Sequence, residues 1–209
     1  MMTLFSPPVP LLRVKRHMAV ALTLSLTLLL ALLPASSHAT DWDIEQLMHS
    51  LAQTRSGHAR FVETKSIAML DKPVESSGEL FYSAPDHLEK RTLKPKPELM
   101  TVDGDTLLIE RGRQKHRLQL QAYPELAAFI DSIRGTLAGD RKTLERNYQL
   151  SLDGNVAHWT LQLLPTDEKM RAVVKHIRIA GEHDTVHSIA ITQADGDSSM
   201  MLIEPLATP

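Results

Sequence analysis

The feature of this sequence that most constrains its fold is a series of short segments in which apolar and polar residues alternate. Such alternation is typical of β-strands with one buried face and one face in water. Eleven segments are predicted as strands on this pattern: 60–70, 78–83, 88–93, 98–102, 106–110, 114–122, 148–152, 158–164, 173–179, 186–194 and 200–203. Turn residues separate most of them, at Pro85-Asp86, Asp103-Gly104, Arg111-Gly112, Asp153-Gly154-Asn155, Gly181 and Asp195-Gly196. We therefore expect a meandering antiparallel sheet that curls.

Helical periodicity precedes the first run of strands. Residues 40–55 are predicted to form a helix with an apolar stripe that includes Leu47 and Leu51. Thr40 is the predicted start, as part of a capping box, and Gly57 is the predicted terminator. The role of this helix depends on what its stripe covers.

A second helical region lies between the two runs of strands. Pro124 is suited to the first position of a helix that has Ile130 and Ile133 on its apolar face and ends at Gly139. Asp140 is predicted to cap a further short helix. This layout predicts helices that lie against one face of the curled sheet.

Apolar residues of several strands are expected to share the covered face. Tyr148 and Leu150 point one way on one strand, and Trp159 and Leu161 do so on another. Only two or three short helices are predicted to cover the concave side, and aromatic residues make up 4% of the chain. Two interpretations stay open: a packed core, or a sheet that encloses a cavity.

The N-terminal segment, residues 1–39, has the three parts of a secretory signal peptide. Basic residues precede an uncharged, mostly apolar run over 18–33, and Ser37-His38-Ala39 is a small-x-small cleavage site. We expect cleavage after Ala39, a periplasmic location and one mature domain over residues 40–209. The alternative is an uncleaved membrane anchor, although the apolar run is slightly short for a spanning helix of about 20 residues.

Composition narrows the class of partner. The chain has no cysteine, so it has neither a disulfide framework nor a lipid-attachment cysteine. Without residues 1–39 it has 20 basic residues against 25 acidic ones, a net charge of −5, which disfavours nucleic acid as a partner. The expected protein is a monomer that uses no cofactor and binds no nucleic acid.

No arrangement of residues predicts catalysis. Asp103, Asp105 and Glu110 are close in sequence, but a turn explains the first and strand alternation separates the others. A glycine-flanked nucleophilic serine is missing from the sequence. His183 and His187 have metal-ligand spacing only on a helix, whereas their segment is predicted as a turn. We therefore expect neither an enzyme nor a metal site.

A basic stretch follows one of the predicted turns and contains Lys90, Arg91 and Lys94. These side chains could meet phosphate or carboxylate headgroups at the mouth of a cavity. They could instead dock on an acidic membrane surface. The third interpretation is a solvated strand edge, kept soluble by lysines and prolines.

Three stretches resemble the LolA family, periplasmic carriers that take lipoproteins to the outer membrane of Gram-negative bacteria. ARFVETKS (59–66) is similar to the family's first strand. SGELFYSAPDHL (77–88) is the strongest match, with a glycine, an apolar-aromatic strand, a proline and then an apolar residue three positions on. VDGDTLLIE (102–110) is similar to the family's Asp-Gly turn and next strand. The likeness covers nearly the whole mature domain.

The resemblance implies an α+β fold, an unclosed and strongly curved antiparallel β-barrel of about eleven strands, with helices covering its concave apolar face. The interior would take up acyl chains of a lipoprotein or another lipid, received from an inner-membrane donor complex and passed to an outer-membrane acceptor. The lipid-binding residues expected on this basis are Leu80, Tyr82, Ala84, Leu88, Leu47, Leu51, Ile130, Ile133, Tyr148, Leu150, Trp159 and Leu161.

Two positions depart from the family pattern. The carriers usually have an arginine immediately before the proline, where it ties the barrel to its lid, and this chain has Ala84 there. Lys90 replaces a family aromatic residue. The departures fit a LolA-related protein whose cargo is not a lipoprotein. The two functional hypotheses are a periplasmic carrier that shuttles acyl chains between the membranes, and a lipid-binding sensor or accessory module in the synthesis or export of another lipid.

Overall fold

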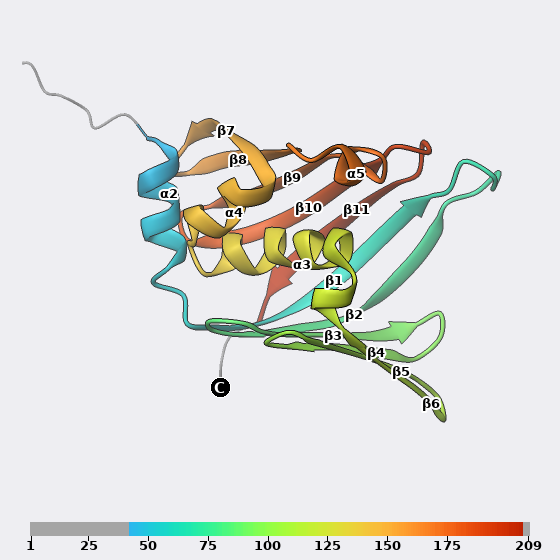
Figure 1. The fold of residues 1–209 in the computed structure, drawn as a ribbon. Coiled ribbons are helices and arrows are strands. Elements are labelled where there is room, and N and C mark those ends of the chain that lie inside the picture. The colour runs from blue at the N-terminus through green and yellow to red at the C-terminus, as the bar shows by residue number, and fades with distance from the viewer. Residues whose placement is uncertain (1–41, 207–209) are drawn as a thin grey trace, which may run out of the picture. The chain divides into compact units, whose positions relative to one another are not determined.

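The computed structural model describes residues 42–206, which form one antiparallel sheet of eleven strands and four α-helices (Figure 1). The helices are α2 (Ile44–Leu51), α3 (Pro124–Leu137), α4 (Arg141–Asn147) and α5 (Glu168–Arg171), with a 3-10 turn, η1 (Leu120–Ala122), before α3. The strands are β1 (Ser56–Ser66), β2 (Val74–Ser83), β3 (His87–Lys94), β4 (Glu98–Asp103), β5 (Thr106–Arg111), β6 (Gln114–Gln119), β7 (Tyr148–Asn155), β8 (His158–Pro165), β9 (Val174–Glu182), β10 (Thr185–Gln193) and β11 (Ser198–Pro205). The α+β fold class is confirmed, and each of the eleven predicted strands overlaps a strand of the sheet. The predicted signal peptide and its cleavage site lie outside the described residues.

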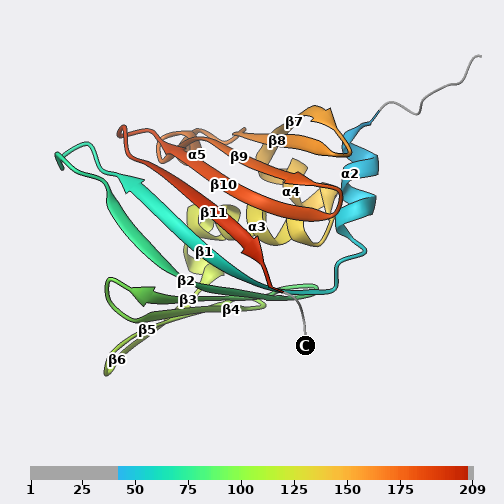
Figure 2. The same ribbon diagram turned by 180° about the vertical axis from the view of Figure 1, so that it is seen from behind.

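The sheet is a meander whose two halves join through its first and last strands. Its strand order is β6-β5-β4-β3-β2-β1-β11-β10-β9-β8-β7, with every neighbouring pair antiparallel. The sheet curls but does not close, because β6 and β7 are left as its two edges in the described part of the chain. α3 and α4 lie on the concave side, in front of the strands in Figure 1 and behind them in Figure 2.

Strand register separates the two faces of the sheet, because directly opposite residues of antiparallel strands point to the same side. Phe61 is opposite Gly78 and Ile203, whereas Val62 is opposite Leu202. Phe61 is 2% exposed, while Val62 and Leu202 are 43% and 59% exposed. The side of Phe61 is therefore the covered, concave face, and the side of Val62 is the convex face.

The main core fills the concave face of β7–β10, beneath α2, α3, α4 and α5. The hydroxyl of Tyr148 ties β7 to α3 by donating to the Ala128 carbonyl at 3.1 Å, and the indole N–H of Trp159 donates to the His183 carbonyl, in the turn between β9 and β10, at 3.1 Å. The buried members of this cluster are Leu47, Met48, Leu51, Ala128, Leu144, Tyr148, Trp159, Leu161, Leu163, Met170, Val174, Ile177, Ile179 and Val186. Burial of this apolar surface is the main contribution to the stability of the fold.

A second, smaller cluster lies at the other end of the sheet. Val102, Leu107 and Leu120 pack there against Ile130 of α3. Phe129 of α3 packs against both clusters, so this one helix bridges the two halves of the concave face. The second cluster has fewer buried side chains than the main core, and α3 with η1 supplies its helical cover.

The first helix is shorter than predicted. Asp43, not Thr40, is the N-cap of α2: its carboxylate accepts the Gln46 N–H at 2.9 Å, and the Gln46 side chain returns the bond to Asp43. Gly57 does not terminate the helix, because α2 ends at Leu51 and Gly57 already belongs to β1. The capping box is therefore present, but it lies three residues further along the chain.

Two predicted turns are wrong. Gly154 and Gly181 lie within β7 and β9, on either side of Trp159 in one cross-strand row. A Cβ atom at either glycine would approach a backbone carbonyl oxygen to 2.1 Å, and at Gly181 it would also approach the indole ring to 2.5 Å. These glycines thus make room for neighbouring backbone and for the indole ring. The turn after β9 is made instead at His183, whose φ is 53°.

Segment 114–122 is not one strand: β6 stops at Gln119 and η1 follows. No helix among residues 42–206 has both the length and the hydropathy needed to cross a membrane.

Candidate functional site

The predicted lipid-binding residues over β7–β10 are part of a filled core. Leu47, Leu51, Tyr148, Trp159 and Leu161 are each no more than 2% exposed and pack in one cluster. Leu150 is partly buried against the same cluster. Protein interiors packed in this way have the density of organic crystals, so an acyl chain reaches these residues only if the covering helices move. The packed-core interpretation describes this half of the concave face.

A different surface lies over β2–β5. Leu80, Lys90, Met100 and Ile109 follow one another across four strands in a single row on the concave face. Each of them is half-buried, as is Leu88 in the adjacent row. We call the four apolar residues of these two adjacent rows, Leu80, Leu88, Met100 and Ile109, the half-buried row. Because these side chains keep accessible apolar surface on the covered side of the sheet, they are the best-placed candidates for contact with hydrocarbon.

The two predicted lipid-binding residues of α3, Ile130 and Ile133, pack in different halves of the molecule. Ile130 is 7% exposed and packs in the second cluster, whereas Ile133 is partly buried against the main core. α3 is also tied directly to the sheet by Arg134, whose guanidinium donates to the Gly104 carbonyl in the β4–β5 turn at 2.6 Å. The same guanidinium pairs with Asp131, one turn earlier, at 2.6 Å. Its side chain is only 15% exposed.

Ala84 lies one residue beyond the strand that carries Leu80 and Tyr82, and its predicted contact with lipid stays a prediction. β2 ends at Ser83, and Ala84 begins the turn to β3, where its N–H donates to the Arg55 carbonyl at 2.8 Å. The proline that follows has no N–H to donate to a neighbouring strand and interrupts the alternation.

Tyr82 lies on the concave face and is 8% exposed. Its hydroxyl is buried without a hydrogen-bond partner among the described residues. Burial raises the pKa of this phenol, so the group is neutral at physiological pH.

The basic stretch does not form one cluster of free cations. Lys90 and Arg91 lie on opposite faces of β3, because adjacent strand residues alternate. On the convex face the Arg91 guanidinium lies 5.1 Å from the centre of the Phe81 ring and pairs with Glu89. Lys94 is exposed at the end of β3. A single headgroup site made of all three residues is therefore excluded.

Lys90 instead takes part in an ion cluster on the concave face that the sequence analysis missed. Its ammonium lies 2.5 Å from Glu63 Oε2 and 4.9 Å from the centre of the Phe61 ring. Glu63 is 5% exposed. It also forms an ion pair with Lys65 at 3.5 Å and accepts a hydrogen bond from the Ser76 hydroxyl at 3.4 Å. Strand alternation could have placed these residues on the covered face, since Glu63 and Lys65 share the face of Phe61, and Lys90 shares the face of Leu88.

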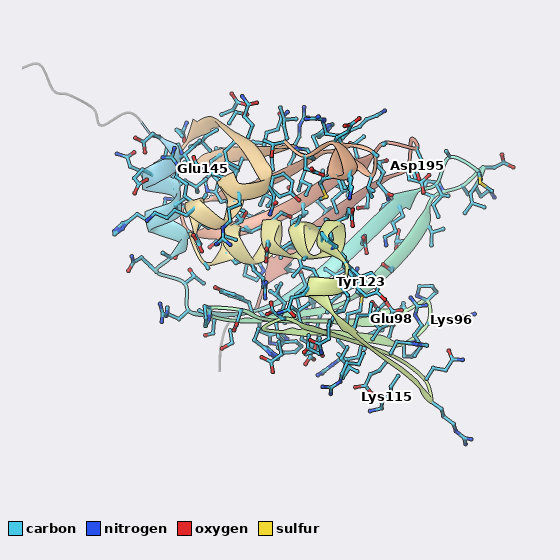
Figure 3. All side chains as sticks on the ribbon, viewed as in Figure 1. Lys96, Glu98, Lys115, Tyr123, Glu145 and Asp195 are labelled. Atoms are coloured by element: carbon cyan, nitrogen blue, oxygen red, sulfur yellow. The ribbon has the colours of Figure 1, made fainter. Side chains whose placement is uncertain are left out.

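This ion cluster lies toward the end of the sheet that is remote from α2. Glu98 and Arg111 pair with each other at the same end, across β4 and β5. Figure 3 shows Lys96 and Glu98 on this side of the molecule, away from α2. The concave face of β1–β5 thus changes along the strands from apolar residues to charged ones.

The two histidines with possible metal-ligand spacing are not brought together with other ligands. His183 is in the β9–β10 turn, and His187 lines an open depression on the convex face beside the His158–Glu182 pair, which is 3.1 Å apart. Within residues 42–206, no group of three or more histidine, aspartate or glutamate side chains is placed to hold a metal ion.

Comparison with known families bears directly on this arrangement. A family model described as outer membrane lipoprotein carrier protein LolA-like matches residues 35–208. The chain belongs to this LolA-like family. The resemblance inferred from the sequence is therefore confirmed.

An outer-membrane lipoprotein carrier protein of Dechloromonas aromatica (strain RCB) is similar to this LolA-like chain, with 31% identity over 120 residues. The match covers 57% of this chain and 55% of the relative, which is about half of the relative's length.

Two solved structures are also similar. The LolA superfamily protein NE2245 from Nitrosomonas europaea has 11% identity and a TM-score of 0.43, with 79% of this chain and 94% of that chain covered. A chain of the Pseudomonas aeruginosa MucA/MucB complex has 15% identity and a TM-score of 0.45, with 80% and 58% covered. At these scores neither structure bears on the function of this LolA-like protein.

Proposed function

We propose that this LolA-like protein is a periplasmic carrier that shelters acyl chains on the concave face of β2–β5, beneath α3, and takes them from the inner to the outer membrane. The observation that carries the proposal is the half-buried row, which places apolar surface on the covered face of the sheet without burying it fully. The family match supports a lipoprotein or another lipid as the cargo.

The energetics favour a surface of this kind over a closed core. Transfer of an acyl chain of about 16 carbons into water costs roughly 0.8 kcal/mol per methylene, or about 12 kcal/mol. A carrier has to offset most of this cost and still release the chain. Half-buried aliphatic side chains shield the chain from water but cover it incompletely, so it is bound less tightly than in a filled core and can be released. Met100 adapts its shape to the chain because its side chain is unbranched.

Direction of transfer is proposed to come from the membrane partners. The sequence has no phosphate-binding loop with which to use a nucleotide. An inner-membrane donor complex and an outer-membrane acceptor with higher affinity for the cargo would suffice, because a carrier only equilibrates between the two. Both partners belong to the proposal.

A pair of variants tests the proposed surface. Ile109→Asp places a carboxylate in the half-buried row, whereas Leu202→Asp places one on the convex face, where Leu202 is 59% exposed. In a titration with a fluorescent fatty acid, wild type and Leu202→Asp are expected to bind alike. Ile109→Asp is expected to bind at least about tenfold more weakly, since desolvating a charge beside the chain costs more than 1.4 kcal/mol.

The controls make the result decisive. Circular dichroism and thermal melting establish that both variants are folded at the assay temperature. Equal binding by Ile109→Asp and wild type, or no binding by wild type freed of copurified lipid, would overturn the proposal.

A further inference from the structure

The ion cluster of Glu63, Lys65 and Lys90 is unusual because it lies on the side of the sheet that holds the core. Glu63 has a side chain that is only 6% exposed, and Lys90 is 24% exposed. Removing such charges from water is costly, and apolar residues of similar volume are often as stabilising or more so. A role other than stability is therefore the better explanation for the cluster.

The composition of the cluster determines what it attracts. Two ammonium groups share one carboxylate, which leaves one net positive charge. In the described part of the chain, Glu63 is the acidic partner that either lysine has within ion-pair distance. Glu63 already accepts hydrogen bonds from Lys90 and Ser76 and forms an ion pair with Lys65 at 3.5 Å. Each ammonium has three N–H donors, so unused donors outnumber unused acceptors.

The cluster also lies beside the half-buried row. Lys90 belongs to the same cross-strand row as Leu80 and Met100, and its ammonium extends across the Phe61 ring toward Glu63. Met201 is directly opposite Glu63 on β11 and faces the same side. A ligand whose chain lies along the row would therefore bring its head to the two ammonium groups.

On these grounds, and resting on the function proposed above, we propose that Lys65, Lys90 and Glu63 select amphiphiles with an anionic head, a phosphate or a carboxylate on an alkyl chain. Lys90 is held in place by Glu63, and Lys65 supplies the surplus charge. Lys65 is suited to this because its side chain is 51% exposed and its contact with Glu63, at 3.5 Å, is the longer of the two. Charge-assisted hydrogen bonds to such a head are roughly twice as strong as neutral ones.

The test uses three probes with the same chain and different heads: dodecyl phosphate, dodecanol and dodecyltrimethylammonium. Isothermal titration of the mature protein is expected to give an affinity for dodecyl phosphate about tenfold higher than for dodecanol, and the weakest binding for the cation. Inorganic phosphate alone is expected to bind at least about a hundredfold more weakly than dodecyl phosphate, since it lacks the chain.

Variants separate the head from the chain. Lys65→Met removes the surplus charge but leaves the Lys90–Glu63 pair intact, and is expected to abolish the preference for dodecyl phosphate over dodecanol. Glu63→Gln removes the negative charge of the cluster, so it is expected to strengthen the preference for dodecyl phosphate. Lys175→Met is the matched control, because Lys175 is exposed on β9 and outside the cluster. It should behave as wild type.

The outcomes separate this inference from the function on which it rests. Equal affinity of wild type for dodecyl phosphate and dodecanol would overturn the selection of anionic heads and leave the carrier proposal standing. A preference that survives Lys65→Met would overturn the assignment to this cluster, as would binding of inorganic phosphate as tight as that of dodecyl phosphate. Absence of binding by every probe would overturn both proposals.

Discussion

Loss of the Arg134 contact is expected to loosen α3 from the sheet and to improve access to the half-buried row. Arg134→Met removes the hydrogen bond to the Gly104 carbonyl and the pair with Asp131, both at 2.6 Å. A hydrogen bond from a charged donor is worth about 1.5–3 kcal/mol, and the lower value applies because the side chain is still 15% exposed. A loss of about 1.5 kcal/mol increases the population with α3 detached about tenfold.

Two assays follow from that magnitude. Amide hydrogen exchange in α3 is expected to be about tenfold faster in the variant, because exchange reports the detached population. If chains bind only when α3 is detached, the apparent Kd for dodecanol should also fall about tenfold. Arg146→Met is the matched control, since the side-chain hydrogen bond of Arg146 goes to Thr143 within the same helix, α4. Unchanged exchange in α3 and unchanged affinity in Arg134→Met would refute the role of this contact.

Three further perturbations have expected outcomes. Lys90→Glu places a second carboxylate against Glu63, and urea unfolding should show a loss of about 3 kcal/mol. Gly139→Ala should lower the free energy of unfolding by more than about 2 kcal/mol, because the new Cβ would approach a backbone oxygen of α2 to 2.1 Å. Gly112 has a similar φ but open space around it, so Gly112→Ala should lower it by about 1 kcal/mol. Thermal melting curves of the two variants compare these losses. Burial raises the pKa of Tyr148 to about 12. The phenol therefore ionises first in the unfolded chain, and the stability present below pH 10 is lost as the pH rises toward 12. Tyr148→Phe should remove this loss, and identical pH profiles of stability for variant and wild type would contradict the prediction.

Much of the fold could be predicted because alternation is a local property of the sequence. Each strand was found from its own residues, and Asp140 was correctly predicted to cap α4, where its carboxylate accepts the Thr143 N–H at 3.0 Å. The hydrogen bond from the Thr143 hydroxyl lowers the pKa of Asp140, and the bond from the Thr143 N–H adds to this effect. Gly154 and Gly181 were misassigned as turns because their role depends on Trp159, which lies on a neighbouring strand.

The candidate site was harder to predict because it depends on contacts across the sheet. Alternation alone places Lys90 on the same face as Leu88 and on the other face from Arg91. It does not show that Lys90 reaches Glu63, 27 residues away in the sequence. The bond from Arg134 to Gly104 spans 30 residues and has no local signal. Filling of the main core depends on side-chain volumes and on where the helices lie, which periodicity does not specify.

The most direct test of the central claim locates a bound chain on one face of the sheet. Met200 and Met201 are neighbours on β11 that point to opposite faces, because Met201 is opposite Glu63 and Met200 is opposite Thr64. With methyl-labelled methionine and a fatty acid that carries a spin label on its chain, binding on the concave face should broaden the Met100 and Met201 methyl signals more strongly than the Met200 signal. Broadening of Met200 with Met100 unaffected, or no broadening of any of the three at saturating ligand, would contradict it.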